Sequence, residues 1–399
     1  MSYWNDVVNK KDTYPQRRYL DNAATTWPKP EAVWKVWEQA ARENGVTVGR
    51  GTYREALAAE NIVRQLRQDV AALIGVSPER ISLPLSATLG LNQAIHGVLK
   101  RGDHVIATAA DHNATLRPLR HLEKKGEIQL TIVPCDARGW VDPDEIVRAW
   151  QVNTRLVALS HASNVTGVVQ DVKTIVHSAR EREAISLLDA SQSLGHVPFS
   201  QDLPTADIVV SPGHKWLMGM HGTAILYVRQ GIDFEPLIQG GTGLKSDSLD
   251  MPVETQDLIE VGTLDVPSVA AIGAGCQWLH EKGVESVALA CKELAQACYD
   301  GLRDIQGVRL ITANPAEVGI GPPIISMVCD GYSPPEVAVM LEQIAGVQVR
   351  SGYHCAACIH EYLGTTQGGT VRVSFGPFSD ISDVDAVVSA TKKIMLYRA

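Results

Sequence analysis

The 399-residue chain is long enough for two domains that each bury a core of their own. Its content of 45% hydrophobic and 20% charged residues is typical of a globular enzyme, and its net charge of −9 argues against nucleic acids and anionic membranes as partners. No apolar run is long enough to cross a bilayer, and the first ten residues do not resemble a signal peptide.

The cysteines point to a reducing compartment. Their number, 7, is odd, and most of them fall inside predicted helices or strands, which is not the pattern of a disulfide framework. We therefore expect reduced thiols and a cytoplasmic protein. Cys355 and Cys358 differ from the others, because they lie in a polar loop.

The chain begins with a polar arm over 1–18, followed by a short strand that starts at Tyr19. A helix over 31–43 comes next, then a glycine-rich segment whose one charged residue is Arg50. A longer helix over 53–74 follows, with apolar residues at helical spacing.

From residue 80 on, predicted strands and helices alternate with short links. The expected strands are 80–85, 104–109, 128–134, 155–160, 185–189, 206–210 and 223–228, and the expected helices are 88–100, 114–125, 142–150 and 171–183. Such alternation predicts a mostly parallel sheet covered by helices on both faces. Ligands of such sheets bind at the carboxyl ends of the strands.

A glycine-rich connector over 231–264 leads to two helices and then to a second, smaller α+β unit. Its expected helices are 267–282, 285–305, 334–345 and 380–397, and its expected strands are 308–312, 323–329, 347–350 and 370–374. We expect a large domain over 19–264, and a small domain formed by 265–399 together with the arm over 1–18.

Lys215 lies in a short segment between two apolar strands. Burying an unpaired ammonium there would be costly, and burial lowers the pKa of a lysine towards neutrality. That is the state a Schiff-base lysine needs, because only the free amine attacks a carbonyl. The segment by itself also fits a tight turn whose ammonium lies in water.

Other polar residues stand at the ends of neighbouring strands. Thr88 opens a helix and fits an anion site or a simple N-cap, and a lone histidine such as His112 is more often a surface or core residue than a catalyst. Asn164, Asp189 and Gln192 end the next two strands. A carboxylate at the end of a buried strand is costly unless it meets a cation, such as the pyridinium of pyridoxal phosphate.

Together these strand ends predict a pyridoxal-phosphate site. They would supply a phosphate anchor, a cover for the ring, donors to the O3′ oxygen, a partner for the pyridinium nitrogen and a Schiff-base lysine.

The loop over 350–360 carries Cys355 and Cys358. A zinc ion would need four ligands at chelating spacing, and no second Cys/His pair is evident, so we expect no metal site. The C-x-x-C spacing also permits a redox pair. The interpretation we favour is a nucleophilic thiolate at Cys355, stabilised by cations at His354 and Arg350.

The chain resembles the class V aminotransferases of fold type I and, within them, the group II cysteine desulfurases. The resemblance runs from Tyr19 to the C-terminal helix. It is carried by Leu20-Asp-Asn-Ala-Ala24, Ala87-Thr88, Asp111-His112, Ser163-Asn164-Val-Thr-Gly167, Asp189-Ala-Ser-Gln192, Gly213-His214-Lys215, Gly262-Thr263, Arg350-Ser-Gly-Tyr-His-Cys355-Ala and Thr370-Val-Arg372-Val-Ser374. It implies an α/β fold with a mostly parallel seven-stranded sheet in the large domain, and pyridoxal phosphate as cofactor.

The resemblance also implies roles around the cofactor ring. His112 would stack on the ring, Asp189 would hold its nitrogen, and Gln192 and Asn164 would approach O3′. Lys215 would carry the cofactor as a Schiff base.

At the phosphate end, the resemblance assigns Thr88 and His214, joined in a homodimer by Thr263 of the other subunit. Three departures from the family pattern affect this end: Leu89 where many members have Glu, Pro212 (after Ser211) where many have Ser, and Met220-His221 in place of a Pro-containing pair.

For the substrate, the resemblance assigns Arg372 to the carboxylate, with Arg350, Arg50 and Asn164 around it. The implied reaction converts L-cysteine to L-alanine and leaves the sulfur as a persulfide on Cys355.

In that reaction Lys215 would take the Cα proton, and His112 is a candidate for proton transfer at the sulfur. The sulfur would pass to an acceptor protein for iron–sulfur cluster or thiocofactor assembly. L-selenocysteine is a second candidate substrate. A selenocysteine lyase, a cysteine or cystine C–S lyase and a non-catalytic sulfur-relay protein stay open as alternatives.

Overall fold

The computed structural model describes residues 17–43, 45–49, 51–199, 206–243 and 247–397. A seven-stranded sheet has the strand order β2-β8-β7-β6-β5-β3-β4. Its strands are β2 (Ile81–Ser82), β3 (His104–Thr108), β4 (Gln129–Val133), β5 (Thr154–Ser160), β6 (Ile185–Asp189), β7 (Ile208–Pro212) and β8 (Ala224–Val228). The strands from β7 to β4 run parallel, and β8 is antiparallel to both of its neighbours. The expected mostly parallel seven-stranded sheet is confirmed.

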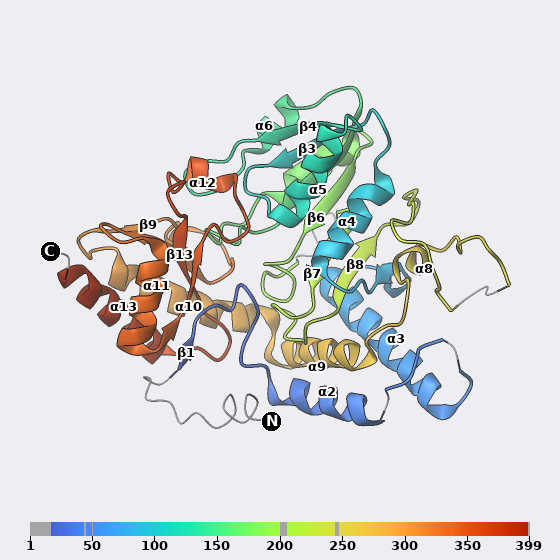
Figure 1. Ribbon diagram of the computed structural model, residues 1–399, viewed down its shortest axis with the longest axis horizontal. Helices are drawn as coiled ribbons and strands as arrows, with labels where there is room; N and C mark the ends of the chain where they lie inside the picture. The colour runs from blue at the N-terminus through green and yellow to red at the C-terminus, as the bar shows by residue number, and fades with distance from the viewer. Residues whose placement is uncertain (1–16, 44, 50, 200–205, 244–246, 398–399) are drawn as a thin grey trace.

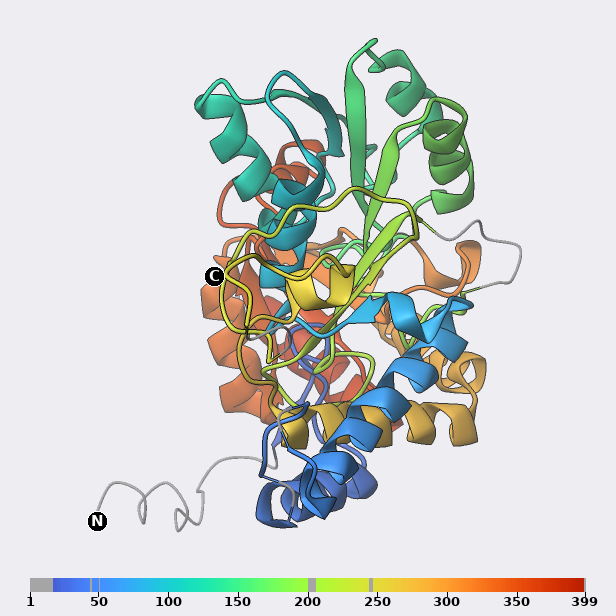
Figure 2. The ribbon, with the colours of Figure 1, turned by 90° about the vertical axis from the view of Figure 1, so that its right-hand side faces the viewer.

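Helices cover both faces of this sheet (Figures 1 and 2). One face packs against α4 (Ala87–Val98) and α5 (Asn113–Lys124), and the other against α3 (Arg54–Ile74), α6 (Pro143–Arg148) and α7 (Val172–Glu181). In β3, Val105 and Ala107 face the first group and Ile106 faces the second, because side chains alternate along a strand. Both faces are buried, which is why the strands read as continuous apolar runs.

The N-terminal helix α2 (Glu31–Glu43) and the helix α9 (Val266–Lys282) lie side by side below the sheet (Figure 1). α9 also packs against α3, and the short helix α8 (Thr255–Ile259) belongs to the glycine-rich connector. A Cβ at Gly275 of α9 would lie 2.1 Å from the carbonyl oxygen of Leu217, so this helix crosses directly over the turn that carries Lys215. The domain boundary between 264 and 265 stays a prediction.

A second, four-stranded antiparallel sheet has the order β12-β13-β10-β9. Its strands are β9 (Val308–Leu310), β10 (Ile324–Cys329), β12 (Arg350–Gly352) and β13 (Thr370–Ser374), and around it lie α10 (Val284–Leu302), α11 (Pro334–Ala345) and α13 (Ile381–Leu396). The short helix α12 (Ile359–Tyr362) packs through Ile359 into the core of the large sheet. Near the start of the chain, β1 (Arg18–Tyr19) pairs in parallel with β11 (Val347–Gln348). The beginning of the described chain therefore joins the C-terminal unit.

One predicted strand is much shorter than expected. The strand over 80–85 is reduced to β2, because Pro84 has no N–H to continue the ladder and serves only as an acceptor, at 2.8 Å from the N–H of Ala224. Among the described helices, none has the length and apolar character needed to cross a membrane.

Candidate active site

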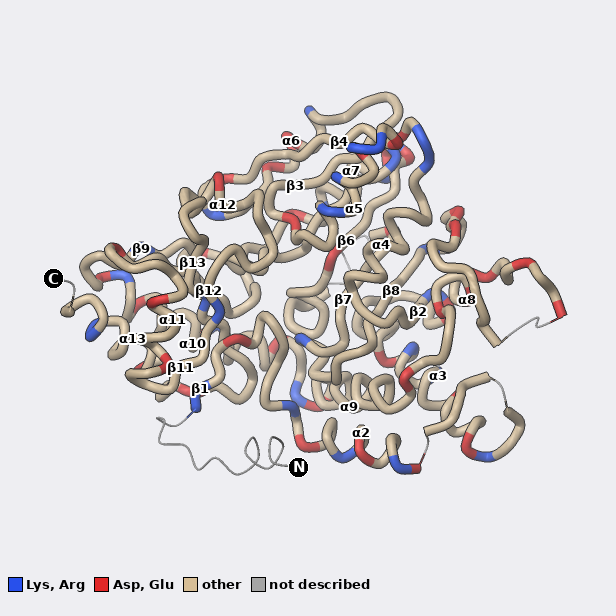
Figure 3. Tube along the Cα trace, viewed as in Figure 1, with Lys and Arg blue, Asp and Glu red and all other residues tan. Residues whose placement is uncertain are grey.

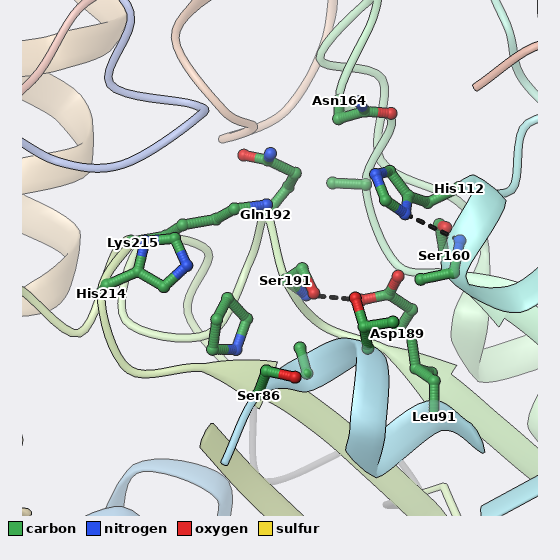
Figure 4. Close-up of a pocket in the computed structure, with 15 residues that line it drawn as sticks. Ser86, Leu91, His112, Ser160, Asn164, Asp189, Ser191, Gln192, His214 and Lys215 are labelled. Carbon is green, nitrogen blue, oxygen red and sulfur yellow. Dashed lines mark hydrogen bonds between the residues drawn. The ribbon is translucent and has the colours of Figure 1, made fainter. Parts of the chain in front are cut away.

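A pocket opens at the carboxyl ends of β5, β6 and β7, beside the N-terminus of α4 (Figure 4). It contains about 590 Å³ of space outside protein atoms, part of which is open to solvent. The predicted residues that line it are Thr88, His112, Asn164, Asp189, Gln192, His214 and Lys215.

Lys215 faces Asp189 inside this pocket. Burial lowers the pKa of Lys215 from 10.5 to about 8, and the negative charge of Asp189 opposes that shift. Near neutral pH a larger fraction of Lys215 is therefore the free amine than for a lysine in water, although the ammonium still predominates below pH 8. The lowered pKa disfavours the alternative of a tight turn whose ammonium lies in water.

The turn that carries Lys215 is held by the N-terminal segment. Thr26 Oγ1 donates a hydrogen bond to the carbonyl oxygen of Lys215 at 2.8 Å, and Lys29 Nζ donates one to the carbonyl oxygen of His214 at 2.6 Å. The next side chain along, Trp216, is fully buried. The backbone of this turn is held by these contacts, which fixes the point from which the Lys215 side chain starts.

Asp189 ends β6 with only 5% of its surface exposed. Its Oδ1 accepts a hydrogen bond from the backbone N–H of Ser191 at 2.9 Å. Among the described residues no salt bridge neutralises this carboxylate. Because a buried unpaired charge is costly, a cationic group of a ligand is the partner that this position favours.

His112 caps the N-terminus of α5. Its Nδ1 accepts a hydrogen bond from the N–H of Ala114 at 3.0 Å, so the ring proton lies on Nε2. Burial lowers the pKa of His112 to about 4, and the ring is neutral at physiological pH. His112 thus presents a neutral ring with one N–H donor to the pocket.

The N-terminus of α4 forms the anion-binding end of the pocket. Ser86 caps the helix by accepting a hydrogen bond from Leu89 N. Thr88, the second residue of the helix, lines the pocket. The buried Nδ1 of His214 has no partner within the described chain, and its ring stacks on His221 at 4.5 Å between centroids. Backbone N–H groups and an unused imidazole nitrogen suit a phosphate.

The departures from the family pattern have structural explanations. Pro212 lines the pocket, whereas the hydroxyl of Ser211 donates to the carbonyl oxygen of Ala190 at 3.3 Å and does not line it. Leu89 contributes its backbone N–H to the cap. His221 supplies a ring that covers His214.

A model of the aminotransferase class-V family matches residues 18–387. This chain belongs to that family. The expected family and fold class are confirmed.

Relatives of this class-V aminotransferase chain are named as cysteine desulfurases. A probable cysteine desulfurase of Methanothermobacter thermautotrophicus is 30% identical over 382 residues, which cover 94% of each chain. The solved apo cysteine desulfurase of Thermococcus onnurineus NA1 has a TM-score of 0.87 at 27% identity, covering 95% of this chain and 94% of that one. A cysteine desulfurase of Escherichia coli has a TM-score of 0.84 at 26% identity, with the same coverage of 95% and 94%.

Class-V aminotransferases and cysteine desulfurases depend on pyridoxal phosphate. The residues present fit this cofactor. Asp189 is a buried carboxylate without a paired cation, His214 has a buried nitrogen without a partner, and α4 directs its N-terminus at the pocket. These three features match a pyridinium nitrogen at one end and a phosphate at the other.

Gln192 and Asn164 line the pocket but are partly engaged by the protein. The Gln192 amide donates to Ala23 O at 2.8 Å and accepts from the indole N–H of Trp216 at 3.0 Å. Asn164 Nδ2 donates to His354 O at 2.6 Å. The predicted contacts of both residues with O3′ stay predictions, and Gln192 retains one N–H for such a contact.

The Cys355 loop is attached to the rim of the pocket. The backbone N–H of Asn113, directly after His112, donates to Cys355 O at 2.7 Å, and Arg350 Nη2 lies 3.1 Å from Cys355 Sγ. His354 and Cys355 both have left-handed backbones, with φ of 50° and 60°. Two such residues in succession are strained and persist only where the surroundings hold them.

His354 does not act as the expected cation beside Cys355. Burial, together with Arg372 and Arg350, lowers the pKa of His354 to about 2, so the ring is neutral. Its Nε2 points at Thr370, lying 3.1 Å from the carbonyl oxygen and 2.9 Å from the hydroxyl. That part of the sequence interpretation is wrong, and Arg350 is the cation at the thiol.

Other side chains of the loop are also engaged. His360 uses Nδ1 toward Thr365 Oγ1 at 2.7 Å and Nε2 toward Tyr353 O at 3.2 Å, so neither nitrogen is free for a metal. Within the described residues, no three His, Cys, Asp or Glu side chains form a group that could hold a metal ion. Cys355 is exposed and Cys358 is half-buried, and the redox-pair alternative is not tested by this arrangement.

Arg372 is buried in β13, behind the pocket wall. Its guanidinium forms a salt bridge with Asp21 at 2.6 Å and donates to Asn164 O at 2.9 Å, and its Nε has no partner within the described chain. The predicted contact of Arg372 with a substrate carboxylate stays a prediction. Asp21 is the group with which that carboxylate would compete.

The assignments of Thr263 and Arg50 are not tested by the described pocket. Thr263 is exposed and does not line the pocket, and Arg50 lies outside the described residues. Both assignments stay predictions.

Sequence reasoning missed several residues of the site. These residues are Asp21, Lys29 and Asp111. The Asp111 carboxylate is fully buried and accepts hydrogen bonds from Thr108 N at 2.8 Å and from Ser160 N at 2.5 Å. It thereby joins the ends of β3 and β5 next to His112. Asp21 and Asp111 each follow a short apolar run, which is the signal that drew attention to Asp189.

Proposed function

We propose that this chain is a cysteine desulfurase that binds pyridoxal phosphate in the pocket and moves sulfur from L-cysteine to Cys355, releasing L-alanine. The supporting observation is the attachment of the Cys355 loop to the pocket. Asn164, which lines the pocket, holds His354 O, and Asn113 holds Cys355 O. The loop that carries the Cys355 thiol is therefore attached to residues at the pocket that Lys215 lines, which supports a shared role for the two groups.

The residues of the pocket divide the work of holding the cofactor. Lys215 would hold it covalently, Asp189 would hold the ring nitrogen, and Thr88 and His214 would bind the phosphate, with His112 against the ring. When bound, the cofactor supplies an electron sink for the electron pair released at the substrate Cα.

The chain's own groups then move protons and sulfur. Once the substrate amine has displaced Lys215 from the cofactor, the freed Lys215 amine would take the Cα proton. Arg372 would bind the substrate carboxylate. Cys355 Sγ attacks the substrate sulfur, so that an S–S bond forms as the C–S bond breaks. One cysteine and one thiol give one alanine and one persulfide, and no oxidant is needed.

The test is product analysis with L-cysteine. We expect alanine and sulfide in equal amounts when a reductant is present, and without reductant a mass increase of one sulfur atom on the peptide that contains Cys355. Pyruvate and ammonia would instead indicate a C–S lyase. Failure to acquire visible absorbance after incubation with pyridoxal phosphate would favour a non-catalytic relay protein.

A further inference from the structure

The exposed side of α5 carries a row of basic side chains. Arg117, Arg120 and Lys124 are exposed and follow Asn113 at helical spacing, which places all four on one stripe of the helix. Arg120 pairs with Glu123 of the same helix, while Arg117 and Lys124 have no carboxylate partner within the described chain. We call Arg117, Arg120 and Lys124 the α5 basic stripe.

The stripe starts at the proposed nucleophile. Asn113, one helical turn before Arg117 on the same side of α5, donates its backbone N–H to Cys355 O at 2.7 Å. Arg350, at 3.1 Å from Cys355 Sγ, extends the positive charge to the thiol itself. A molecule that lies along α5 would therefore reach the exposed Cys355.

The charge of the stripe contrasts with that of the whole chain. The protein has a net charge of −9, and Figure 3 shows acidic and basic positions both spread over the molecule, with basic positions among them at α5. An acidic protein would be repelled by the molecule as a whole and attracted at this face. Nothing in the packing of α5 requires these cations, because its buried side uses Leu116, Leu119 and Leu122.

We propose that the α5 basic stripe is the docking surface for the sulfur acceptor, and that the acceptor presents its thiol on an acidic surface. This inference rests on the proposed function. The acceptor thiolate attacks the outer sulfur of the Cys355 persulfide, a new S–S bond forms on the acceptor, and Cys355 leaves as a thiolate. The sulfur moves as a neutral atom, so no oxidant or reductant enters the step.

The experiment uses two peptides of equal length with one cysteine each, flanked by four Glu in one and by four Lys in the other. The holoenzyme is loaded with L-cysteine, and the rate of sulfur transfer to each peptide is measured at low and at high salt. We expect the acidic peptide to react about tenfold faster at low salt, as electrostatic steering of this size allows. The advantage should shrink at high salt, where charges are screened over about 3–10 Å.

The test variant is Arg117→Glu/Arg120→Glu/Lys124→Glu, which should reverse the preference between the two peptides. A matched control, Lys35→Glu/Lys392→Glu/Lys393→Glu, changes the net charge equally on α2 and α13, away from α5, and should leave the preference intact (Figure 1). Equal rates for the two peptides, or equal effects of the two variants, would overturn the proposal.

A second readout separates this inference from the proposed function. Binding of the fluorescently labelled peptides is followed by anisotropy, which requires no turnover. Suppose that the acidic peptide binds the wild type but not the α5 variant, and that no alanine forms from cysteine. This result would refute the desulfurase activity but support the α5 docking surface. If alanine and the persulfide form but neither peptide is preferred, the desulfurase activity is supported and the α5 docking surface is refuted.

Discussion

Cys355 and Cys358 are three positions apart, yet they occupy different environments. Cys355 is exposed beside Arg350, while Cys358 is half-buried against the core and its pKa is raised by burial and by Glu361. An exposed thiol next to a guanidinium is suited to nucleophilic attack, and a thiol with a raised pKa is not.

We predict that Cys355→Ser retains cofactor binding but loses alanine formation by several orders of magnitude, because a serine hydroxyl is far less ionised than a thiol. Cys358→Ser should lose much less. Alanine formation is measured from L-cysteine, and bound cofactor from its visible absorbance. Turnover of cysteine by Cys355→Ser at the wild-type rate would show that the persulfide route is wrong.

We expect the burial of Lys215 to lower the stability of the cofactor-free protein. The pKa of Lys215 is about 8 in the folded chain, whereas we take the ordinary lysine value of 10.5 for the unfolded chain. Below pH 8 folding therefore buries an ammonium, which costs free energy. Between pH 8 and 10.5 the unfolded chain binds more protons than the folded one, so the stability contributed by this group rises with pH.

We therefore predict that Lys215→Met raises the melting temperature of the cofactor-free protein at pH 7. The advantage over wild type should be fully present below pH 8 and should vanish as the pH approaches 10.5. The measurement is thermal unfolding of both proteins across this range. A difference in melting temperature that is independent of pH would mean that buried charge is not its cause.

The helix α9 positions the active-site turn through close backbone packing. A Cβ at Gly275 would lie 2.1 Å from Leu217 O, whereas a Cβ at Gly273 of the same helix meets only the Asp69 carboxylate, at 4.0 Å. Both glycines lie in the interior of α9, so an alanine has the same effect on helix propensity at each. Only Gly275 lies close to the backbone of the turn, which makes Gly273 a matched control.

We predict that Gly275→Ala destabilises the protein by about 1–3 kcal/mol, the cost typical of overpacking, and weakens cofactor binding by shifting the Lys215 turn. Gly273→Ala should be neutral or stabilising by up to about 1 kcal/mol, because Ala favours a helix over Gly. Denaturant unfolding and cofactor titration measure the two effects. Equal stability of the two variants would show that α9 does not press on the turn.

At the level of the whole molecule, Thr263 is exposed and outside the pocket of its own chain, in a glycine-rich connector. We predict a homodimer in which Thr263 of each subunit reaches the phosphate end of the other's pocket. Sedimentation should give twice the chain mass of 43.2 kDa, and Thr263→Ala should weaken cofactor binding about tenfold, as expected for loss of one hydrogen bond to a charged group. A fully loaded monomer would contradict this prediction.

The sequence by itself determined the sheet and the residues at its edge. Thr88, His112, Asn164, Asp189 and Lys215 were predicted to meet, and they do, because parallel strands that alternate with helices present their carboxyl ends along one edge. Continuous apolar runs between those residues located the parallel strands, whereas the expected strand over 80–85 is only two residues long.

Only the tertiary structure decided which groups are charged and which are paired. His354 was expected to be a cation, but burial makes it neutral, and burial depends on packing that no local pattern encodes. Arg372 forms a salt bridge with Asp21, from which it is separated by most of the sequence, and Lys29 donates a hydrogen bond to the carbonyl oxygen of His214. Such contacts depend on how β13 and the N-terminal segment fold back onto the sheet, and spacing along the chain carries no information about them.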